Sequence, residues 1–221
     1  MCSFLFIQFA PILLYGLVLL GGSFLIGVII GFLSPSDAKR IAIFGSRSSG
    51  KTTLWKQLKN EFSDSITRST LDIESLENFE IEYDGKKKTI ISPKDYSGSE
   101  TFVKDYDRVI EKGTFIYYLV DLNTLSDLKK DTRARLLKIA KVIKEKSLKK
   151  EDYGFRLVAT HYKEYHDKTN KSKEDARKEL INVLELGNMK ETIVDTPKTV
   201  MVAELTDSND IEQFRKQIVE S

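Results

Sequence analysis

The stretch Lys39–Thr52, KRIAIFGSRSSGKT, decides the fold of this chain. It opens with a short apolar run typical of a buried strand, and Gly45–Thr52 matches the pattern G-x-x-x-x-G-K-[ST] at every fixed position. The next residues, 51–62, have the apolar spacing of an amphipathic helix. Glycines permit a tight loop whose backbone N–H groups can surround a phosphate, and the helix N-terminus adds partial positive charge. The stretch therefore predicts a strand, a phosphate-binding loop and a helix, in that order.

The side chains of this loop have different predicted roles. Lys51 is expected to reach the terminal phosphates of a nucleotide as a catalytic group, and the hydroxyl of Thr52 to ligate Mg²⁺. Arg47 either crowds the terminal phosphate or serves it directly through its guanidinium group. The predicted nucleotide contacts of the segment are Gly45, Ser46, Arg47, Ser48, Ser49, Gly50, Lys51, Thr52 and Thr53.

The rest of the folded part alternates between strand and helix patterns. Asp84-Gly85 between two strand-like runs indicates a hairpin, whereas residues 63–77 lack a period and are interpreted as a loop. Alternating strands and helices favour a parallel sheet covered on both faces. The predicted fold class is α/β, a three-layer P-loop NTPase domain whose mostly parallel six-stranded sheet includes one antiparallel strand. The predicted strands are 39–45, 79–83, 88–92, 114–121, 155–160 and 199–203, and the predicted helices are 51–62, 130–146, 172–186 and 210–219.

A long apolar segment, residues 4–33, precedes this domain, and residues 1–36 contain no Lys, Arg, Asp or Glu. About 20 apolar residues suffice to cross a bilayer core, so the segment predicts one transmembrane helix. A cleaved signal peptide would have a basic start and a shorter apolar core, and a buried core helix of this length without charge would be unusual. We therefore expect a membrane anchor at 1–35 and one folded domain at 36–221. The cations that directly follow the segment, at 39 and 40, place that domain in the cytosol.

Composition narrows the remaining function classes. The formal net charge is +2 and no large basic cluster is present, so a nucleic-acid partner is not expected. The single cysteine, Cys2, cannot form a disulfide within the chain, which fits a reducing compartment for the folded part.

A second acidic site follows the predicted hairpin, in the sequence Asp95-Tyr96-Ser97-Gly98. A carboxylate at a strand end can hold Mg²⁺ through water, and a glycine can offer its N–H to a terminal phosphate because no side chain blocks the approach. Asp95 is therefore a predicted metal ligand and Gly98 a predicted nucleotide contact.

These features together resemble the Ras-like small GTPases over about residues 39–221, which would make that part a G domain. The sequence YLVD at 118–121 and the apolar segment are most similar to the Arf-like branch, especially the membrane-anchored β subunits of the signal recognition particle receptor. The resemblance implies GTP and GDP as ligands with Mg²⁺, and an effector that binds two switch loops, about 63–77 and 95–107. It makes Thr70 the expected third metal ligand, with Thr67 as the alternative. It also implies base contacts from the loop that contains Ala203 and Glu204.

The guanine-reading motif of that family, N/T-K-x-D, is only partly present at Thr160-His161-Tyr162-Lys163-Glu164. If Thr160 is first, Lys163 stands where the aspartate should be. If His161 is first, Glu164 takes that place as a hydrogen-bond acceptor for the base. Thr160, His161, Lys163 and Glu164 are all candidate base contacts, and the choice between guanine and adenine stays open.

A second departure from the family pattern concerns hydrolysis. Ser99 stands where many family members place a Gln or His that orients the attacking water, and its side chain is shorter. Ser99 and Arg47 are therefore candidate catalytic residues of a slow GTPase that acts as a switch. Two alternatives are a nucleotide-binding docking module at a membrane that does not hydrolyse its ligand, and a P-loop ATPase or kinase.

Overall fold

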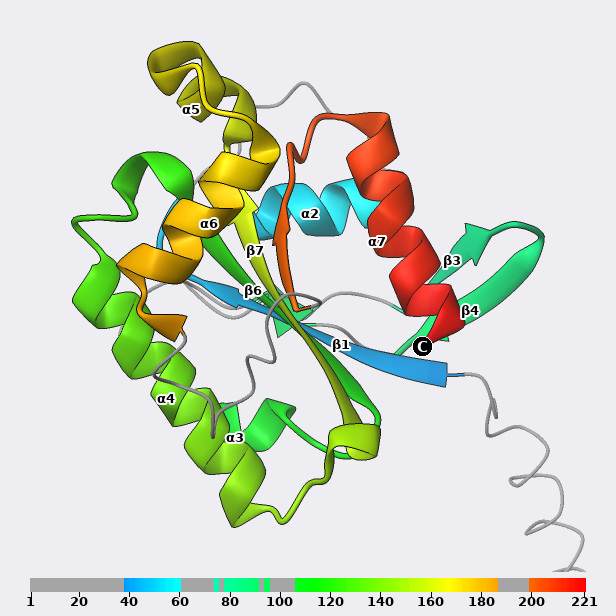
Figure 1. Cartoon of the computed structure of the whole chain (residues 1–221). Coiled ribbons are helices and arrows are strands. Elements are labelled where there is room, and N and C mark those ends of the chain that lie inside the picture. The colour runs from blue at the N-terminus through cyan, green and yellow to red at the C-terminus, as the bar shows by residue number, and fades with distance from the viewer. Residues whose placement is uncertain (1–37, 61–73, 76–77, 92–93, 96–105, 187–198) are drawn as a thin grey trace, which may run out of the picture. The chain divides into compact units, whose positions relative to one another are not determined.

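The computed structural model describes residues 38–60, 74–75, 78–91, 94–95, 106–186 and 199–221 (Figure 1). The chain divides into two compact units, Met1–Ala38 and Lys39–Ser221, and the fold described below lies in the second. The predicted membrane anchor lies outside the described residues. Among the residues that are described, no helix is both long and apolar enough to span a bilayer.

A mostly parallel sheet forms the centre of the domain, with the spatial order β2-β5-β1-β6-β7-β8. In this spatial order, the neighbouring strands β5-β1, β1-β6, β6-β7 and β7-β8 are parallel. At one edge, β2 pairs with β5 in the antiparallel direction. The strands on this path are β1 (Ala38–Gly45), β2 (Glu74–Ser75), β5 (Lys94–Asp95), β6 (Thr114–Asp121), β7 (Tyr153–Thr160) and β8 (Val200–Val202).

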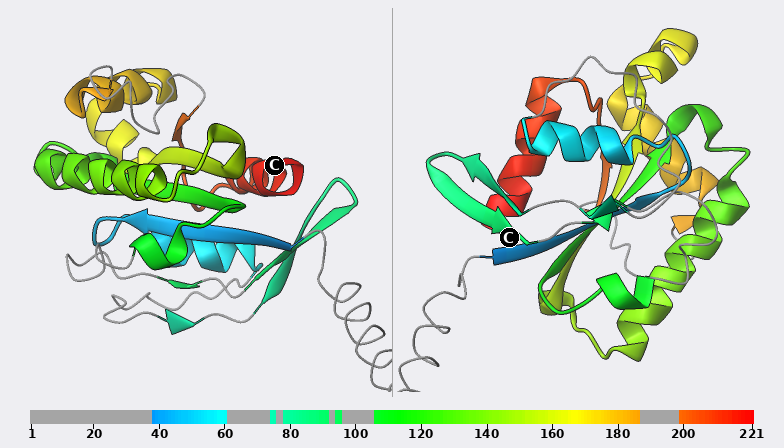
Figure 2. Two further views of the ribbon diagram at one scale, coloured as in Figure 1. Left: turned by 90° about the horizontal axis from the view of Figure 1, so that it is seen from below. Right: turned by 180° about the vertical axis from the view of Figure 1, so that it is seen from behind.

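The predicted hairpin is present as β3 (Phe79–Tyr83) and β4 (Lys86–Ile90), and it extends outward beside the C-terminal helix (Figure 2). Asp84 and Gly85 have φ angles of 49° and 71°, the left-handed pair that a two-residue type I′ turn requires. Because this turn has only two residues, the second strand begins at Lys86 rather than at the predicted position 88.

The same hairpin continues into the sheet. The Phe79–Ile90 partners lie four positions along each strand from the Ser75–Lys94 partners, so the two pairs of strands share one register. In this register β2 extends β3, and β5 extends β4. Each arm of the hairpin is thus one interrupted strand. The prediction of a mostly parallel six-stranded sheet with one antiparallel member is therefore confirmed. The interpretation of 63–77 as loop is wrong at Glu74–Ser75, because these residues pair with β5.

Helices cover both faces of the sheet. One face carries α2 (Lys51–Leu58) and α7 (Ser208–Glu220). The other face carries α3 (Tyr106–Val109), α4 (Lys129–Glu145), α5 (Tyr162–Thr169) and α6 (Lys173–Val183). Two short 3₁₀ turns, η2 (Leu122–Thr124) and η3 (Lys150–Asp152), complete the described connections.

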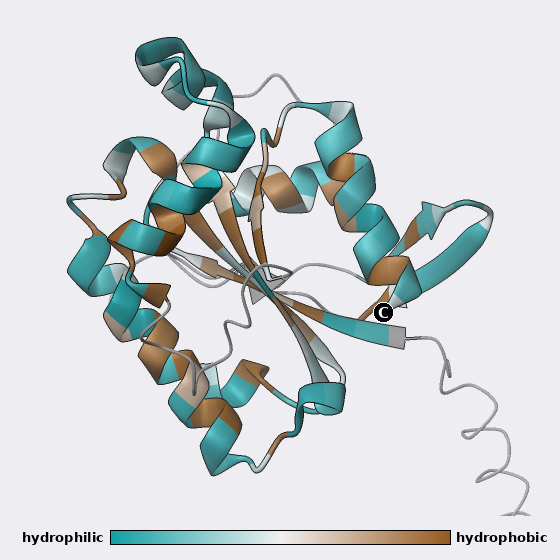
Figure 3. Cartoon of the chain, in the orientation of Figure 1, coloured by the Kyte–Doolittle hydropathy of each residue, from teal (hydrophilic) through white to brown (hydrophobic). Residues whose placement is uncertain are grey.

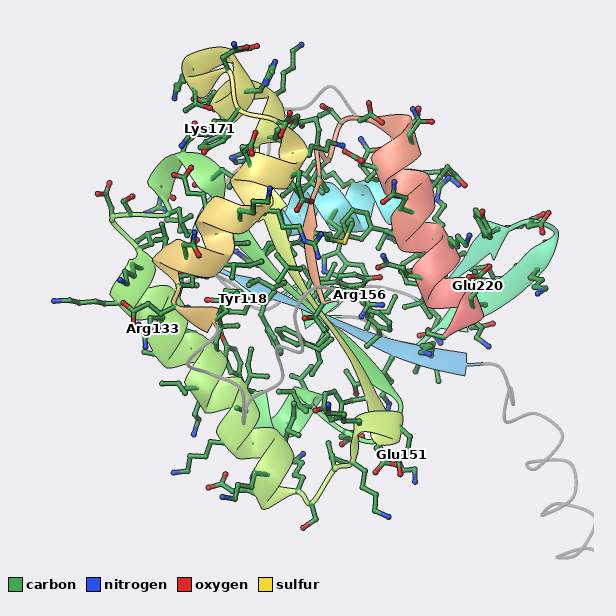
Figure 4. All side chains as sticks on the ribbon, viewed as in Figure 1. Tyr118, Arg133, Glu151, Arg156, Lys171 and Glu220 are labelled. Carbon is green, nitrogen blue, oxygen red and sulfur yellow. The ribbon has the colours of Figure 1, made fainter. Side chains whose placement is uncertain are left out.

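Strand β6 shows how the sequence builds this sandwich, because all eight of its residues are buried. Ile116, Tyr118 and Val120 pack in the core beneath α4 and α6. Phe115, Tyr117 and Leu119 pack in the opposite core beneath α2 and α7. A strand that is buried on both faces reads as a continuous apolar run, as this one does. Hydrophobic residues accordingly gather on the strands and on the inner sides of the helices (Figure 3), and Tyr118 points inward while Arg133 points outward (Figure 4).

Local backbone geometry explains where the predicted helix bounds differ from the observed ones. Helix α2 ends at Leu58, four residues before the predicted end, and Asn60 follows with a left-handed φ of 60° that terminates the turn. Ser172 caps α6 as its sequence suggests, because its side chain accepts a hydrogen bond from the Asp175 N–H. Helix α5 was not expected, because the run from 162 to 169 is mostly polar and has little apolar periodicity.

Candidate functional site

The carboxyl ends of β1, β6, β7 and β8 lie at one edge of the sheet. The register places Gly45 beside Leu119, Asp121 beside Thr160, and Val202 beside Ala159. The loops that leave these strands therefore meet at the same edge, beside α5 and Lys171 rather than at the end marked by Glu151 (Figure 4). In open parallel sheets, ligands bind at this carboxyl edge.

The segment Gly45–Thr52, called the glycine loop from here on, has a backbone that two glycines fix. Gly45 has a φ of 150°, and a Cβ atom added there would lie 2.4 Å from the carbonyl oxygen of Leu119. Gly50 has a φ of 89° and is the N-cap of α2, and a Cβ atom added there would lie 2.5 Å from Leu205 Cδ1. A side chain at Gly45 would collide with the backbone of β6, and one at Gly50 would require a strained backbone and a shift of the Leu205 side chain. Glycine at these two positions therefore permits the close curl of the loop.

The ammonium group of Lys51 crosses the curl of the glycine loop. Lys51 is buried, and its Nζ donates to the Ser46 carbonyl oxygen at 2.8 Å. Ser49 Oγ donates to the same oxygen at 2.9 Å. Ser46 Oγ is buried without a hydrogen-bond partner among the described atoms. Because a buried hydroxyl group normally has a partner, this loop contains one polar atom that no described residue satisfies.

The N-terminus of α2 has two features that suit an anion. Gly50 provides no capping side chain, and no acidic residue lies in the first turn of the helix. The first N–H groups of a helix and the helix dipole give such an end partial positive charge. Thr52 and Thr53 are half-buried in this first turn, whereas Arg47 and Ser48 are exposed at the top of the loop.

Thr160 ties the end of β7 to the glycine loop. Its hydroxyl group is fully buried and lies 3.0 Å from the Ser49 carbonyl oxygen and 3.2 Å from that of Val120. The single hydroxyl hydrogen is thus shared between two acceptors. This contact gives Thr160 a positional role at the end of β7.

His161 follows directly and forms an ion pair with Asp121. The two side chains approach to 3.1 Å between Nδ1 and Oδ2, and Asp121 also accepts a hydrogen bond from the Asn123 N–H at 2.9 Å. The hydrogen bond to Asp121 raises the pKa of His161, against the opposing effect of burial. Burial acts to raise the pKa of Asp121, but the hydrogen bonds from His161 and Asn123 outweigh it, so that pKa is lowered.

Of the two glutamates expected near a base, Glu204 is held in the site and Glu164 is not. Glu204 Oε2 accepts from the Lys163 N–H at 3.0 Å, and its Oε1 accepts from the Thr206 hydroxyl at 2.9 Å. Glu164 is exposed and pairs with Lys168 along the surface of α5, at 2.6 Å. A carboxylate from the loop after β8 therefore lies beside the backbone of Lys163, where the partial motif has no aspartate.

Asp210, in the first turn of α7, anchors the loop that follows β8. Its buried carboxylate accepts from the Glu204 N–H at 2.7 Å and from Lys173 Nζ at 2.7 Å through both oxygens. Ala203 is buried and continues the ladder to the Ala159 carbonyl oxygen at 2.8 Å. We call Asp121, Thr160, His161, Glu204 and Asp210 together the β7–β8 end of the site.

The remaining predicted site residues are not placed. Thr67, Thr70, Gly98 and Ser99 lie outside the described residues, and so does the side chain of Asp95. The backbone of Asp95 pairs with Ile43 of β1, two residues before Gly45, which puts it at the same end of the sheet as the glycine loop. Among the described side chains, no three carboxylate, imidazole or thiol groups come together as a metal site.

Three residues of the site were not predicted as site residues. Asp121 ends a fully buried strand, and an acidic residue at the carboxyl end of a parallel strand is a signal that could have identified it. Leu205 contacts the glycine loop and Asp210 anchors Glu204, but both lie in segments whose sequence carries no local motif.

Neither a scan of protein-family models nor a search of curated proteins finds a match to this chain.

Proposed function

We propose that this chain is a nucleotide-dependent switch of the small-GTPase class, anchored to a membrane by residues 4–33 with its G domain in the cytosol. The observation that carries the proposal is the conformation of the glycine loop. The loop curls between β1 and β6 at the carboxyl edge, holds the buried Lys51 ammonium group across the curl, and leads into a helix with no capping side chain.

The residues of the glycine loop fit a nucleotide phosphate. The close approach of Gly45 and Gly50 to β6 and Leu205 leaves backbone N–H groups as the lining of the loop, and these groups donate to phosphate oxygens. Lys51 exchanges its bond to the Ser46 carbonyl oxygen for a bond to phosphate. Bound Mg²⁺ would neutralise part of the phosphate charge, and Thr52, Thr70 and Asp95 are its proposed ligands.

The β7–β8 end of the site supports guanine as the base. Guanine presents two adjacent donors, N1–H and the 2-amino group, to an acceptor, and the same edge of adenine has no such pair. The carboxylate of Glu204 is fixed beside Lys163 N, and the three hydrogen bonds that it accepts from described residues leave Oε2 able to accept one more. We assign it the reading of that edge, because Glu164 is turned toward Lys168 at the surface.

Hydrolysis is proposed to be slow. A serine at position 99 is too short to orient water as a Gln does. The exposed side chain of Arg47 is free to approach the terminal phosphate from outside the curl. The same two residues favour the second candidate function, a docking module that holds its nucleotide without turnover and presents a fixed surface to a partner.

The first experiment measures nucleotide binding by the full-length chain, purified in detergent. Fluorescent GDP, GTP and ATP analogues are titrated with Mg²⁺ into the wild type and Lys51→Ala, and Lys56→Ala at the last turn of α2 is the matched control. We expect guanine nucleotides to bind, Lys51→Ala to lose at least about a hundredfold in affinity, and Lys56→Ala to bind normally. A wild-type protein that binds none of the three nucleotides would refute the proposed function.

The second experiment tests the base. Glu204→Gln replaces an acceptor by an amide that can donate, so we expect weaker GDP binding and a gain of affinity for xanthosine diphosphate, whose 2-oxo group is an acceptor. Glu164→Gln is the control, and it should leave both affinities unchanged. Equal loss of GDP binding in both variants, or a gain for xanthosine diphosphate only in Glu164→Gln, would move the assignment away from Glu204.

The third experiment separates the switch from the docking module. Single-turnover release of phosphate from GTP bound to the full-length chain should be slow but measurable for a switch, and should accelerate with a partner present. No release over many hours would favour the docking module. A fast rate without any partner would contradict the predicted weakness at Ser99.

A further inference from the structure

The imidazole ring of His161 lies where the ends of β6 and β7 meet the glycine loop. Its Nδ1 atom pairs with Asp121 Oδ2 at 3.1 Å, and its Nε2 atom lies 4.0 Å from the position of a Cβ atom added to Gly50. The backbone of His161 has a left-handed φ of 58°, which is uncommon for a residue other than glycine. Backbone and side chain together thus hold one ring nitrogen on a carboxylate and turn the other toward the N-cap of α2.

We propose that His161, held by Asp121, sets the nucleotide affinity in a proton-dependent manner: the protonated imidazole strengthens the binding of the phosphates, and deprotonation weakens it. The inference rests on the proposed function, because the anion concerned is the phosphate group at the glycine loop. It assigns His161 a binding role through charge rather than through recognition of the base.

The physical reason is the net charge of the pair. With a protonated imidazole, the His161–Asp121 pair is neutral, and Nε2–H is a donor directed toward the loop. With a neutral imidazole, the pair carries one negative charge beside the uncapped N-terminus of α2. A negative charge there opposes the binding of an anion, and the interaction between the two charges is only partly screened in a half-buried site.

The other charged groups around the ring favour its protonated form. Glu204, from the loop after β8, and Glu164, of α5, act on His161 in the same direction as Asp121. Two cations of the neighbouring elements have other partners, since Lys51 donates to the Ser46 carbonyl oxygen and Lys168 to Glu164 and Asn123. Asp121 is thus the acidic group in direct contact with this imidazole, and Glu204 and Glu164 add to the negative potential around it.

The sign of the pH dependence follows. Hydrogen bonding to Asp121 raises the pKa of His161 above its ordinary value of 6.5, so the ring is protonated below that range and loses its proton as the pH rises through the raised value. Nucleotide affinity should therefore be highest at mildly acidic pH and decline across neutral to alkaline pH. Because the protonated imidazole favours phosphate binding, bound phosphate should in turn raise the pKa of His161 further.

The experiment measures GDP affinity of the full-length chain between pH 6 and pH 9 in the wild type, His161→Gln, His161→Lys and Asp121→Asn. GDP itself ionises over this range, but its ionisation is the same with all four proteins. The ratio of two proteins' GDP affinities at the same pH is therefore independent of it. The ratio of the GDP affinity of the wild type to that of His161→Gln should fall roughly fivefold between pH 6 and pH 9. His161→Lys should keep the tight binding without that loss, and Asp121→Asn should move the midpoint to lower pH.

The matched control is His166→Gln. The chain contains only two histidines, and the His166 ring lies on α5 with Nδ1 2.9 Å from the Lys171 carbonyl oxygen. This variant should follow the wild-type profile, and it leaves a single imidazole whose NMR titration gives the pKa of His161 directly. Parallel profiles for the wild type and His161→Gln, or an unchanged midpoint in Asp121→Asn, would overturn the inference. Absence of GDP binding at every pH would instead count against the proposed function.

Discussion

The glycine loop and the β7–β8 end of the candidate site lie at the same edge of the sheet, but they are built in different ways. The glycine loop is one continuous segment, and backbone conformation at Gly45 and Gly50 fixes its shape. The β7–β8 end joins side chains from separate segments through hydrogen bonds, such as those that Glu204 makes to Lys163 and Thr206. Backbone constraint leaves a complete short sequence pattern, whereas this side-chain assembly leaves only the partial motif that begins at Thr160.

The largest expected effect tests the claim that backbone constraint governs the glycine loop. Gly45→Ala places a Cβ atom 2.4 Å from the Leu119 carbonyl oxygen at a φ of 150°, so either β1 or β6 must move. We expect the free energy of unfolding to fall by about 3 kcal/mol or more, since strain and collision add. Urea unfolding followed by the fluorescence of the buried Trp55, the single tryptophan, measures it.

Gly85→Ala is the matched control for this prediction. Gly85 also has a left-handed φ, 71°, but nothing lies within 4 Å of an added Cβ atom. Only the conformational strain remains, so the loss should be about 1 kcal/mol. If both variants lost the same stability, close packing of the glycine loop against β6 would not be what requires glycine at position 45.

The second largest effect is expected at Asp210, which anchors the β7–β8 end of the site. Asp210→Ala leaves the Glu204 N–H without its acceptor and Lys173 without its carboxylate partner. Because Lys173 remains partly exposed to solvent, we expect a loss of about 2 kcal/mol in unfolding free energy rather than the larger loss of a fully buried pair. GDP affinity should fall as well, since Glu204 is no longer held. Glu212→Ala, an exposed change on the same helix, should have neither effect.

A smaller loss of stability is expected when the hydrogen bond between the β7–β8 end and the glycine loop is removed. Thr160→Val keeps the shape of the side chain but removes the hydroxyl group that lies between the Ser49 and Val120 carbonyl oxygens. The expected loss is about 1 kcal/mol of unfolding free energy, with weaker GDP binding because the glycine loop is less firmly held. Thr160→Ser retains the hydroxyl group and should restore both properties. A valine variant with wild-type affinity would show that the two ends act independently.

This contrast also explains how far the sequence could predict the molecule. Strand β6 was predicted at its observed bounds, 114–121, because a strand buried on both faces is a plain apolar run with sharp polar ends. The glycine loop was equally visible, since its constraint is local. Helix α5 was missed because its charged residues leave it few apolar positions. Glu204 was expected near the base, but the contact that positions its carboxylate could not be predicted, because Lys163 lies 41 positions earlier in the chain.

The smallest expected effect is a pH dependence of stability at the His161–Asp121 pair. The pKa of His161 is raised by its bond to Asp121, so its contribution is fully present below the ordinary value of 6.5 and is lost as the pH rises through the raised value. The pKa of Asp121 is lowered despite burial, because His161 and Asn123 donate to it. Its contribution is therefore present above the ordinary value of 3.8 and is lost as the pH falls through the lowered value.

The pair should accordingly stabilise the fold most between these two ranges, near pH 5.5, and less at pH 9. Asp121→Asn removes the charge but keeps an acceptor oxygen for the Asn123 N–H. The difference in urea midpoint between the wild type and this variant should thus be larger at pH 5.5 than at pH 9. An equal difference at both values would mean that Asp121 acts only as a neutral acceptor at the end of β6, and the electrostatic coupling of the β7–β8 end to the glycine loop would lose its basis.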